Sequence, residues 1–594
     1  MKKLKLATML CLMVSAAGMG AGGLIYKAHA ANPTAQAAPP AAERAADDKL
    51  NAPKPPPARI AARQEGSKPK FTLSKETTYI TGPLDNDGYV DYETALNEKL
   101  GKGVDPHKNA NVLLWKALRP EPKSFPMPAE FFRRLKVAEP PRRGAYFLDL
   151  SRYAEEELQL EAGKPTEEVF TQRSWTTQRP WVAKDYPYIA AWLKANEKPL
   201  AVILEATGRP DYHNPMVSNK SGDEGWYGLI GALMPGPVKC YREVAPALAA
   251  RAMVHAGEGR LDAAWQDLLA CERLGRLIAR GADSDEYLLG IGIIQVASHA
   301  ELALLDRARP TAKQARTWQR DRERLSPIPA VADKVDLGRR YTFLNMVMLA
   351  RRHPVKTLRL MEILWGQRRP PLPNPDPEPS PDFVASLDWD AILRTGNAWF
   401  DRVVAAQRIQ DRAQRQKELD RVEEKLKQDA LPPAEVIKAF RQESGRDNEI
   451  SKKLMATLID FSQARIRWMR RHADLHEQRQ RNMHLAFALA AYRGEHKRYP
   501  DRLDVLAPKY LAEVPGDLFS GKALIYRPAK NRYLLYSVGL NGRDDGGRSS
   551  ADTPPGDDLP VRIPLPALPN LNLADALAPQ YLQEVPTDST PARR

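Results

Sequence analysis

Cysteine is scarce in this chain, with 3 among 594 residues. Cys11 lies in an apolar N-terminal stretch and lacks the small neighbouring residue of a lipoprotein signal. Cys240 and Cys271 have no histidine or acidic residue at metal-ligand spacing, which argues against a metal site. We expect a helix to begin near Pro246, with Ala245 opposite Cys271, so Cys240 falls about five residues away, too far for a disulfide. Cys271 continues an apolar stripe, and the sequence therefore predicts a buried free thiol there.

The motifs of the common catalytic classes are also missing. The chain has no Gly-x-Ser-x-Gly elbow, no His-Glu-x-x-His, no phosphate-binding loop and no dinucleotide fingerprint, since Gly290 and Gly292 lack the third glycine. His472, His476 and His484 share one face of a predicted helix, and such a pair of histidines can hold zinc, but no third ligand is identifiable. We interpret this face as a solvated helix surface, and the sequence favours a protein that is not an enzyme.

Nucleic-acid binding is not expected, although the chain is basic. Lysine and arginine number 89 against 74 acidic residues, a formal net charge of +15. Four lysines lie in the first 30 residues, and the remaining excess is spread through helices of mixed charge. No basic run is interleaved with aromatic residues, as a nucleic-acid surface would require.

Residues 1–30 are predicted to be a signal peptide or a membrane anchor. Three lysines precede an apolar stretch from Leu6 to Tyr26, and Ala28-His29-Ala30 has the small-x-small pattern of a signal-peptidase site. The stretch is long enough to span a bilayer, so cleavage and anchoring both remain open. In either case, the body of the protein is expected to be extracytoplasmic, in the periplasm or cell envelope, with the N-terminal segment as a possible tether to the inner membrane.

The rest of the chain is predicted to be mainly α, an irregular helical array with a helical arm, followed by a small C-terminal α+β domain. Two proline-rich stretches are interpreted as linkers, because such segments bury little apolar surface. The predicted parts are an Ala/Pro-rich linker (31–70), a helical domain (71–366), a Pro-rich linker (367–382), a charged helical arm or coiled-coil hairpin (383–475), the α+β domain (476–564) and a tail (565–594).

Two local patterns stand out in residues 71–366. The stretch from Ala245 to Arg280 has the spacing of two helices joined by the turn Gly257-Glu258-Gly259, similar to one tetratricopeptide-type hairpin. Asp85 begins the sequence Asp-Asn-Asp-Gly, which superficially suggests a calcium loop but lacks the rest of the twelve-residue pattern. We predict a plain Asx turn there.

Residues 482–564 carry several motifs in a distinctive order. An amphipathic helix ends near Gly494, Tyr499-Pro500 follows, and two predicted strands (523–527 and 532–538) flank a short hairpin loop. This order resembles the globular domain of type II secretion major pseudopilins, as found in uncharacterised exported proteins of planctomycete-type bacteria. Leu518 and Ala523 depart from the family pattern, and residues 1–30 lack its basic leader and glutamate. Assembly into a pilus is therefore not expected.

The resemblance implies a calcium site in the loop that follows the second strand. The implied ligands are Asn541, Asp544, Asp545, Asp557 and Asp558. Calcium takes six to eight oxygen ligands, and this loop offers enough carboxylate and amide oxygen, Asp552 included. A solvated Gly/Asp loop without a metal is the alternative.

The segment Asp504–Asp517 recurs as Asp575–Asp588, with 10 of 14 positions identical. No strand sequence follows the second copy, so either a docking fragment or an exposed tail is possible.

Together these features favour a non-catalytic exported envelope protein, a structural or protein-interaction scaffold with other envelope proteins as partners. The alternatives are an accessory component of a type II secretion-like system, or an extracytoplasmic hydrolase with an unrecognised site in the Trp-rich stretch around Trp175, Trp181, Trp192, Trp226 and Tyr227. Those aromatic residues are interpreted as core.

Overall fold

The computed structural model describes residues 70–567, apart from 119–126, 160–163, 219–228, 233–237, 365–376 and 443–446. The predicted signal or anchor, nearly all of the linker at 31–70 and the second copy of the repeat at 575–588 lie outside the described residues, as does most of the second linker. The described chain is mostly helical, with a small three-stranded antiparallel sheet near its C-terminus, which confirms the coarse fold class.

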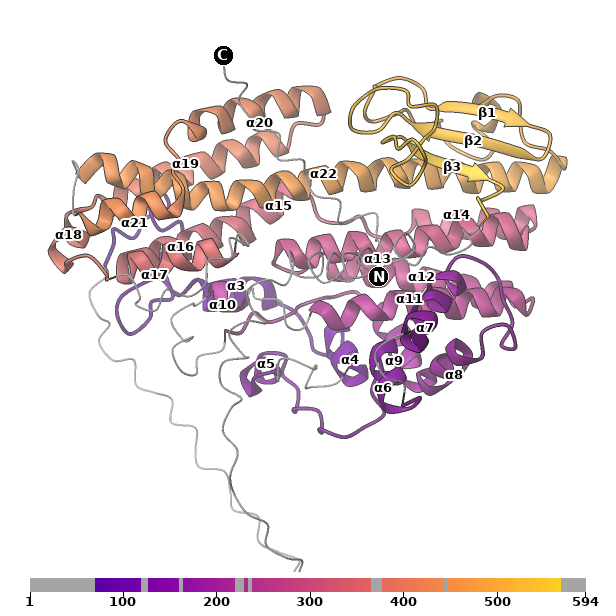
Figure 1. The fold of residues 1–594 in the computed structure, drawn as a ribbon, viewed down its shortest axis with the longest axis horizontal. Helices are drawn as coiled ribbons and strands as arrows, with labels where there is room; N and C mark the ends of the chain where they lie inside the picture. The colour runs from indigo at the N-terminus through magenta and orange to yellow at the C-terminus, as the bar shows by residue number, and fades with distance from the viewer. Residues whose placement is uncertain are drawn as a thin grey trace, which may run out of the picture.

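The first described third of the chain forms short helices that lie along one side of the larger ones, below them in Figure 1. Side chains of the preceding residues cap several of them; for example, Asp91 accepts a hydrogen bond from the backbone of Thr94. These helices are α3 (Tyr92–Gly101), α4 (Ala110–Ala117), α5 (Ala129–Arg134), α6 (Leu150–Glu156), α7 (Lys164–Thr176), α8 (Pro187–Ala195), α9 (Glu197–Thr207) and α10 (Leu229–Ala232).

The predicted helical hairpin is present as α11 (Val238–Gly257) and α12 (Leu261–Ile278). The predicted start near Pro246 is wrong, because α11 begins at Val238 and carries Pro246 inside it, so Cys240 lies within the helix. Cys271 is a buried free thiol, as predicted, and its sulfur lies 4.0 Å from the carbonyl oxygen of Ala245.

The next helix, α13 (Ser284–Ala303), continues into the π-helical turn η3 (Leu304–Ala308), and α14 (Ala312–Glu323) follows. Among the described helices, Ser284–Ala308 alone is long and apolar enough to cross a membrane, but 72% of its apolar window is buried inside the protein. This burial is what a core helix of a folded body shows.

The remaining helices lead to α22 (Asp447–His496), a helix of 50 residues that spans the long axis of Figure 1. Its first half packs into one hydrophobic core with Ile459, and its second half packs into another with Phe487. The elements before it are α15 (Val331–Lys334), η4 (Val335–Arg339), α16 (Arg340–Arg352), α17 (Pro354–Leu364), α18 (Pro381–Ser386), α19 (Trp389–Gln407), α20 (Arg412–Lys427) and α21 (Pro433–Arg441).

This packing corrects the predicted domain boundaries. The stretch 383–475 is not a projecting arm, because Trp389 and Phe400 of α19 share a core with residues that precede the proline-rich segment. The ring of Phe400 lies 5.4 Å from that of Phe343 in α16. The boundary at 475/476 falls inside the continuous helix α22. The charge-rich composition hid the apolar stripe that α19 buries.

The sheet lies against the C-terminal half of α22 (Figure 1). Its strands, β1 (Ile525–Ala529) and β2 (Arg532–Ser537), form the predicted hairpin, and β3 (Leu559–Ile563) adds to β2. Strand β3 was not predicted; it carries Pro560 and lies at the edge of the sheet, where a missing backbone donor is tolerated. A 3₁₀ turn, η5 (Leu503–Leu506), precedes the sheet.

A buried arginine joins four helices beneath the sheet. The guanidinium of Arg322 in α14 lies 3.1 Å from a carboxylate oxygen of Glu272 in α12 and 3.2 Å from one of Glu301 in α13. It also donates to the side-chain oxygen of Gln480 in α22 at 2.7 Å and stacks over Phe487. Burial raises the pKa of Glu301 to about 8, with Arg322 opposing that rise. The network fixes the lateral positions of all four helices.

Helices α12 and α13 cross in close contact at Gly275 and Gly290. A methyl group at Gly290 would lie 2.4 Å from the carbonyl oxygen of Gly275, whereas one at Gly292, on the same helix, would meet nothing within 4 Å. We expect Gly290→Ala to lower the free energy of unfolding by about 1–3 kcal/mol through overpacking. Gly292→Ala should raise it by about 0.5–1 kcal/mol through helix propensity. Urea unfolding of both variants measures the difference, and equal effects would contradict the close crossing.

Candidate metal centre

The loop from 538 to 558 joins β2 to β3 and holds the predicted calcium ligands. Its two ends approach each other closely at Gly539, which has a φ of +68°. A methyl group there would lie 2.0 Å from the carbonyl oxygen of Asp557, so only glycine permits both the turn and the contact. This contact brings the two ends of the loop together, and Asp545, inside the loop, reaches Asp557 across it.

Three carboxylates meet in this loop. One oxygen from each of Asp545, Asp557 and Asp558 lies within 4.8 Å of the others. Backbone donors hold the side chains in place: Asn541 N–H donates to Asp557 at 2.8 Å, Gly547 N–H donates to Asp558 at 2.7 Å, and Asp557 N–H donates to Asp545 at 3.1 Å. The group is therefore built by the backbone of the loop, which fixes where each carboxylate points.

The group retains unused acceptor capacity. The Oδ1 atoms of Asp557 and Asp558 are buried and have no hydrogen-bond partner among the described residues. Asp558 as a whole is only 1% exposed. Burial, together with the neighbouring Asp545 carboxylate, raises the pKa of both Asp557 and Asp558. The cation that the structure places near the group is Arg548, 3.9 Å from Asp545.

These properties fit calcium. Buried carboxylates with raised pKa values and unpartnered oxygens are stabilised by a cation, and a hard divalent ion takes such oxygens as ligands. Asp545, Asp557 and Asp558 would hold the ion. The remaining oxygens of a six- to eight-coordinate shell would come from backbone carbonyls and water.

Two of the five predicted ligands are engaged elsewhere. Asp544 accepts hydrogen bonds from the Tyr536 hydroxyl at 2.9 Å and from Gly546 N–H at 2.8 Å, and it is not part of the three-carboxylate group. Asn541 lies beside the group, but its side-chain oxygen accepts from Arg543 N–H at 2.6 Å. Asp552 forms an ion pair with Arg562 at 2.6 Å.

The other sequence candidates are structural. Within the described part of the chain, the three aspartates are the sole group of acidic, histidine or cysteine side chains close enough to share a metal. The solvated-face interpretation of the histidines is wrong for His476, which is buried and whose pKa burial lowers to about 3. Asp85 forms the predicted Asx turn, accepting from Asp87 and Tyr89 N–H at 3.0 Å each.

The Trp-rich stretch contributes to the core in part, as expected for Trp181 and Trp192, whereas Trp175 is only half-buried. Trp181 and Trp192 are buried, and their indole N–H groups donate to backbone carbonyls, that of Trp192 to Leu148 at 2.8 Å. Trp226 and Tyr227 lie outside the described residues.

No protein-family model, curated protein or solved structure matches this chain. The resemblance of residues 482–564 to pseudopilins therefore rests on the motifs in the sequence.

We expect the full chain to bind calcium saturably in a calorimetric titration, and Asp557→Asn or Asp558→Asn to weaken binding about tenfold or more, because charge count sets calcium affinity. Asp544→Asn is the matched control, since it removes a charge from the same loop outside the group. Affinity should fall as the pH is lowered, because Asp557 and Asp558, with their raised pKa values, take up protons before ordinary carboxylates do.

The asparagine variants should fold, because each replaces a carboxylate with an isosteric amide and removes repulsion from a buried like-charged group. Circular dichroism checks the fold. Binding that is unchanged in Asp558→Asn, or equally weakened in Asp544→Asn, would contradict the assignment.

Proposed function

We propose that the protein is a non-catalytic exported scaffold of the cell envelope, whose pseudopilin-like C-terminal domain binds calcium and contacts other envelope proteins. The observation that carries this proposal is the group of three carboxylates, with two unpartnered oxygens, in a loop of a small domain that is fixed to a large helical body.

The attachment of the sheet domain supports a scaffold role. Asn482 of α22 donates to the carbonyl oxygen of Leu559 at 2.8 Å, and Gln478 accepts from Leu518 N–H at 2.6 Å. After β3, the chain returns to the body, where Leu565 N–H donates to Asp306 at 2.9 Å. A domain held along one side in this way presents its loop in a constant position relative to the helices.

Calcium would act on this loop. Neutralising three neighbouring carboxylates removes their mutual repulsion and ties the middle of the loop, at Asp545, to its end, at Asp557 and Asp558, through one ion. Since loops held by a rigid framework are common binding surfaces, the ordered loop is the surface that we assign to partner contact.

An accessory role in a type II secretion-like system is the second candidate. The order of long helix, turn, hairpin and acidic loop favours it, because this is the order on which the pseudopilin resemblance rests. In that case the partners would be proteins of the secretion apparatus, and deletion of the protein should reduce secretion.

The test is chemical crosslinking of the full chain in cells of the source organism, followed by purification with and without a calcium chelator. We expect specific envelope partners for the wild type and for Asp544→Asn, and their loss on chelation and in Asp557→Asn with Asp558→Asn. Recovery of the same proteins in every condition, or of none above background, would refute the proposed role.

Compartment is tested separately by protease accessibility. With the outer barrier opened and the inner membrane intact, the helical body should be digested if the chain is exported. Protection until the inner membrane is lysed would overturn the extracytoplasmic assignment.

A further inference from the structure

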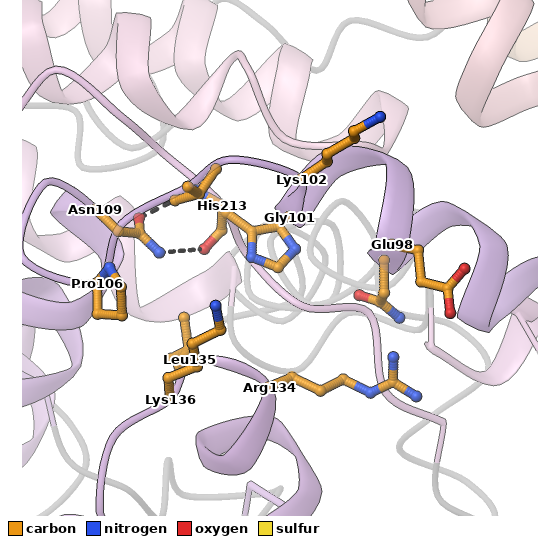
Figure 2. Close-up of a pocket in the computed structure, with 11 residues that line it drawn as sticks. Glu98, Gly101, Lys102, Pro106, Asn109, Arg134, Leu135, Lys136 and His213 are labelled. Carbon is orange, nitrogen blue, oxygen red and sulfur yellow. Dashed lines mark hydrogen bonds between the residues drawn. The ribbon is translucent and has the colours of Figure 1, made fainter.

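A pocket of about 280 Å³ lies on the N-terminal third of the molecule, far from the acidic loop in the sequence. The end of α3, the start of α4, the end of α5 and the segment after α9 form it (Figure 2). Its lining residues include Gly101, Asn109, Arg134, Lys136 and His213.

His213 is fixed at the wall of this pocket through its backbone. Its N–H donates to Asn109 Oδ1 at 3.0 Å, and its carbonyl oxygen accepts from the side-chain amides of Asn109 at 3.1 Å and Asn111 at 3.2 Å. The imidazole lies against Gly101, where a methyl group would come within 3.0 Å of the ring. A glycine at this position therefore makes room for the ring.

The imidazole carries an unused polar atom. His213 is 7% exposed, and its Nε2 has no hydrogen-bond partner among the residues that the structure describes. A buried polar atom without a partner costs free energy, so a group bound in the pocket that accepts a hydrogen bond from Nε2–H would be favoured.

The charges around the pocket favour an anion. In Figure 2, Lys136 lies below and to the left of the imidazole, and the Arg134 side chain runs below it to the right, toward the side where Glu98 lies. The Lys102 side chain extends away from the pocket. Burial, followed by the positive charges of Arg134 and Lys136, lowers the pKa of His213 to about 4. Arg134 uses its Nε for Glu130, at 2.7 Å.

We propose that this pocket binds a small oxyanion, a carboxylate or phosphate group, held by Arg134 and Lys136 with the Nε2–H of His213 as a hydrogen-bond donor. Charge-assisted hydrogen bonds to oxyanions are stronger than hydrogen bonds between neutral groups. The planar guanidinium of an arginine can donate to two adjacent oxygens of a carboxylate or phosphate at once. The volume is at the lower end of the range for ligand pockets, which restricts the ligand to a compact molecule.

The first experiment is calorimetric titration of the full chain at neutral pH and low salt, with inorganic phosphate in one arm and succinate in the other. We expect saturable binding in at least one arm, and the arm that binds more tightly identifies the preferred group. Lys136→Gln should weaken binding about tenfold or more, because it removes a charge-assisted contact. Glu98→Gln should bind at least as tightly as the wild type, because it removes a negative charge from the rim.

Lys116→Gln is the matched control. Lys116 is an exposed lysine of α4 that does not line the pocket, so its loss reduces the net charge equally and should leave binding unchanged. Equal weakening in Lys116→Gln and Lys136→Gln would show diffuse charge attraction and overturn the proposal, as would no saturable heat in either arm.

The second experiment follows the Cε1 resonance of His213 by NMR over a pH series, assigned from its absence in His213→Gln. A bound oxyanion should raise the pKa of His213 above its value of about 4, because negative charge stabilises the imidazolium. A resonance that titrates identically with and without saturating anion would place the anion elsewhere and refute the role of His213.

Discussion

The buried guanidinium of Arg322 is the contact on which the central architecture depends. It faces Glu272 and Glu301 on two helices and Gln480 on a third. Arg276, one turn after Glu272 in the same helix, pairs with the other carboxylate oxygen of Glu272 at 3.2 Å. Removing one partner of a buried ion pair costs about 3–5 kcal/mol, because the other charge is left uncompensated. Helices α12, α13, α14 and α22 are therefore held in one arrangement rather than merely packed by apolar surface.

The position of α22 in turn decides where the sheet lies. One half of this helix belongs to the core formed with α16 and α19, and the other half to the core formed with α12, α14 and the strands. The contacts of Gln478 and Asn482 with Leu518 and Leu559 carry that position into the sheet domain. The acidic loop is thus connected, through one continuous helix, to the opposite end of the molecule.

The acidic loop and the His213 pocket each contain a buried polar atom that has no hydrogen-bond partner and lies beside charges of one sign, negative in the loop and positive in the pocket. In the loop, Asp557 and Asp558 keep buried oxygens without partners among like charges; in the pocket, His213 keeps a buried nitrogen without a partner beside two cations. Folded proteins pair nearly all of their buried polar groups, so an unpartnered buried atom among charges of one sign is a place where a ligand of the opposite charge would be stabilised. The two places therefore suit ligands of opposite charge, a cation and an anion.

Local sequence patterns were sufficient to predict several secondary-structure elements of this protein. Apolar spacing located the α11–α12 hairpin, the strand and hairpin-loop pattern located β1 and β2, and the resemblance carried by the order of local motifs singled out the acidic loop. Each of these depends on residues close together in the chain. The tertiary structure alone decided that Asp545 rather than Asp544 joins Asp557 and Asp558, since backbone turns set the direction of each side chain. It also placed His213 beside Arg134 and buried Arg322 within a stretch whose composition resembles a helix surface. Such contacts join distant segments, and no local spacing encodes them.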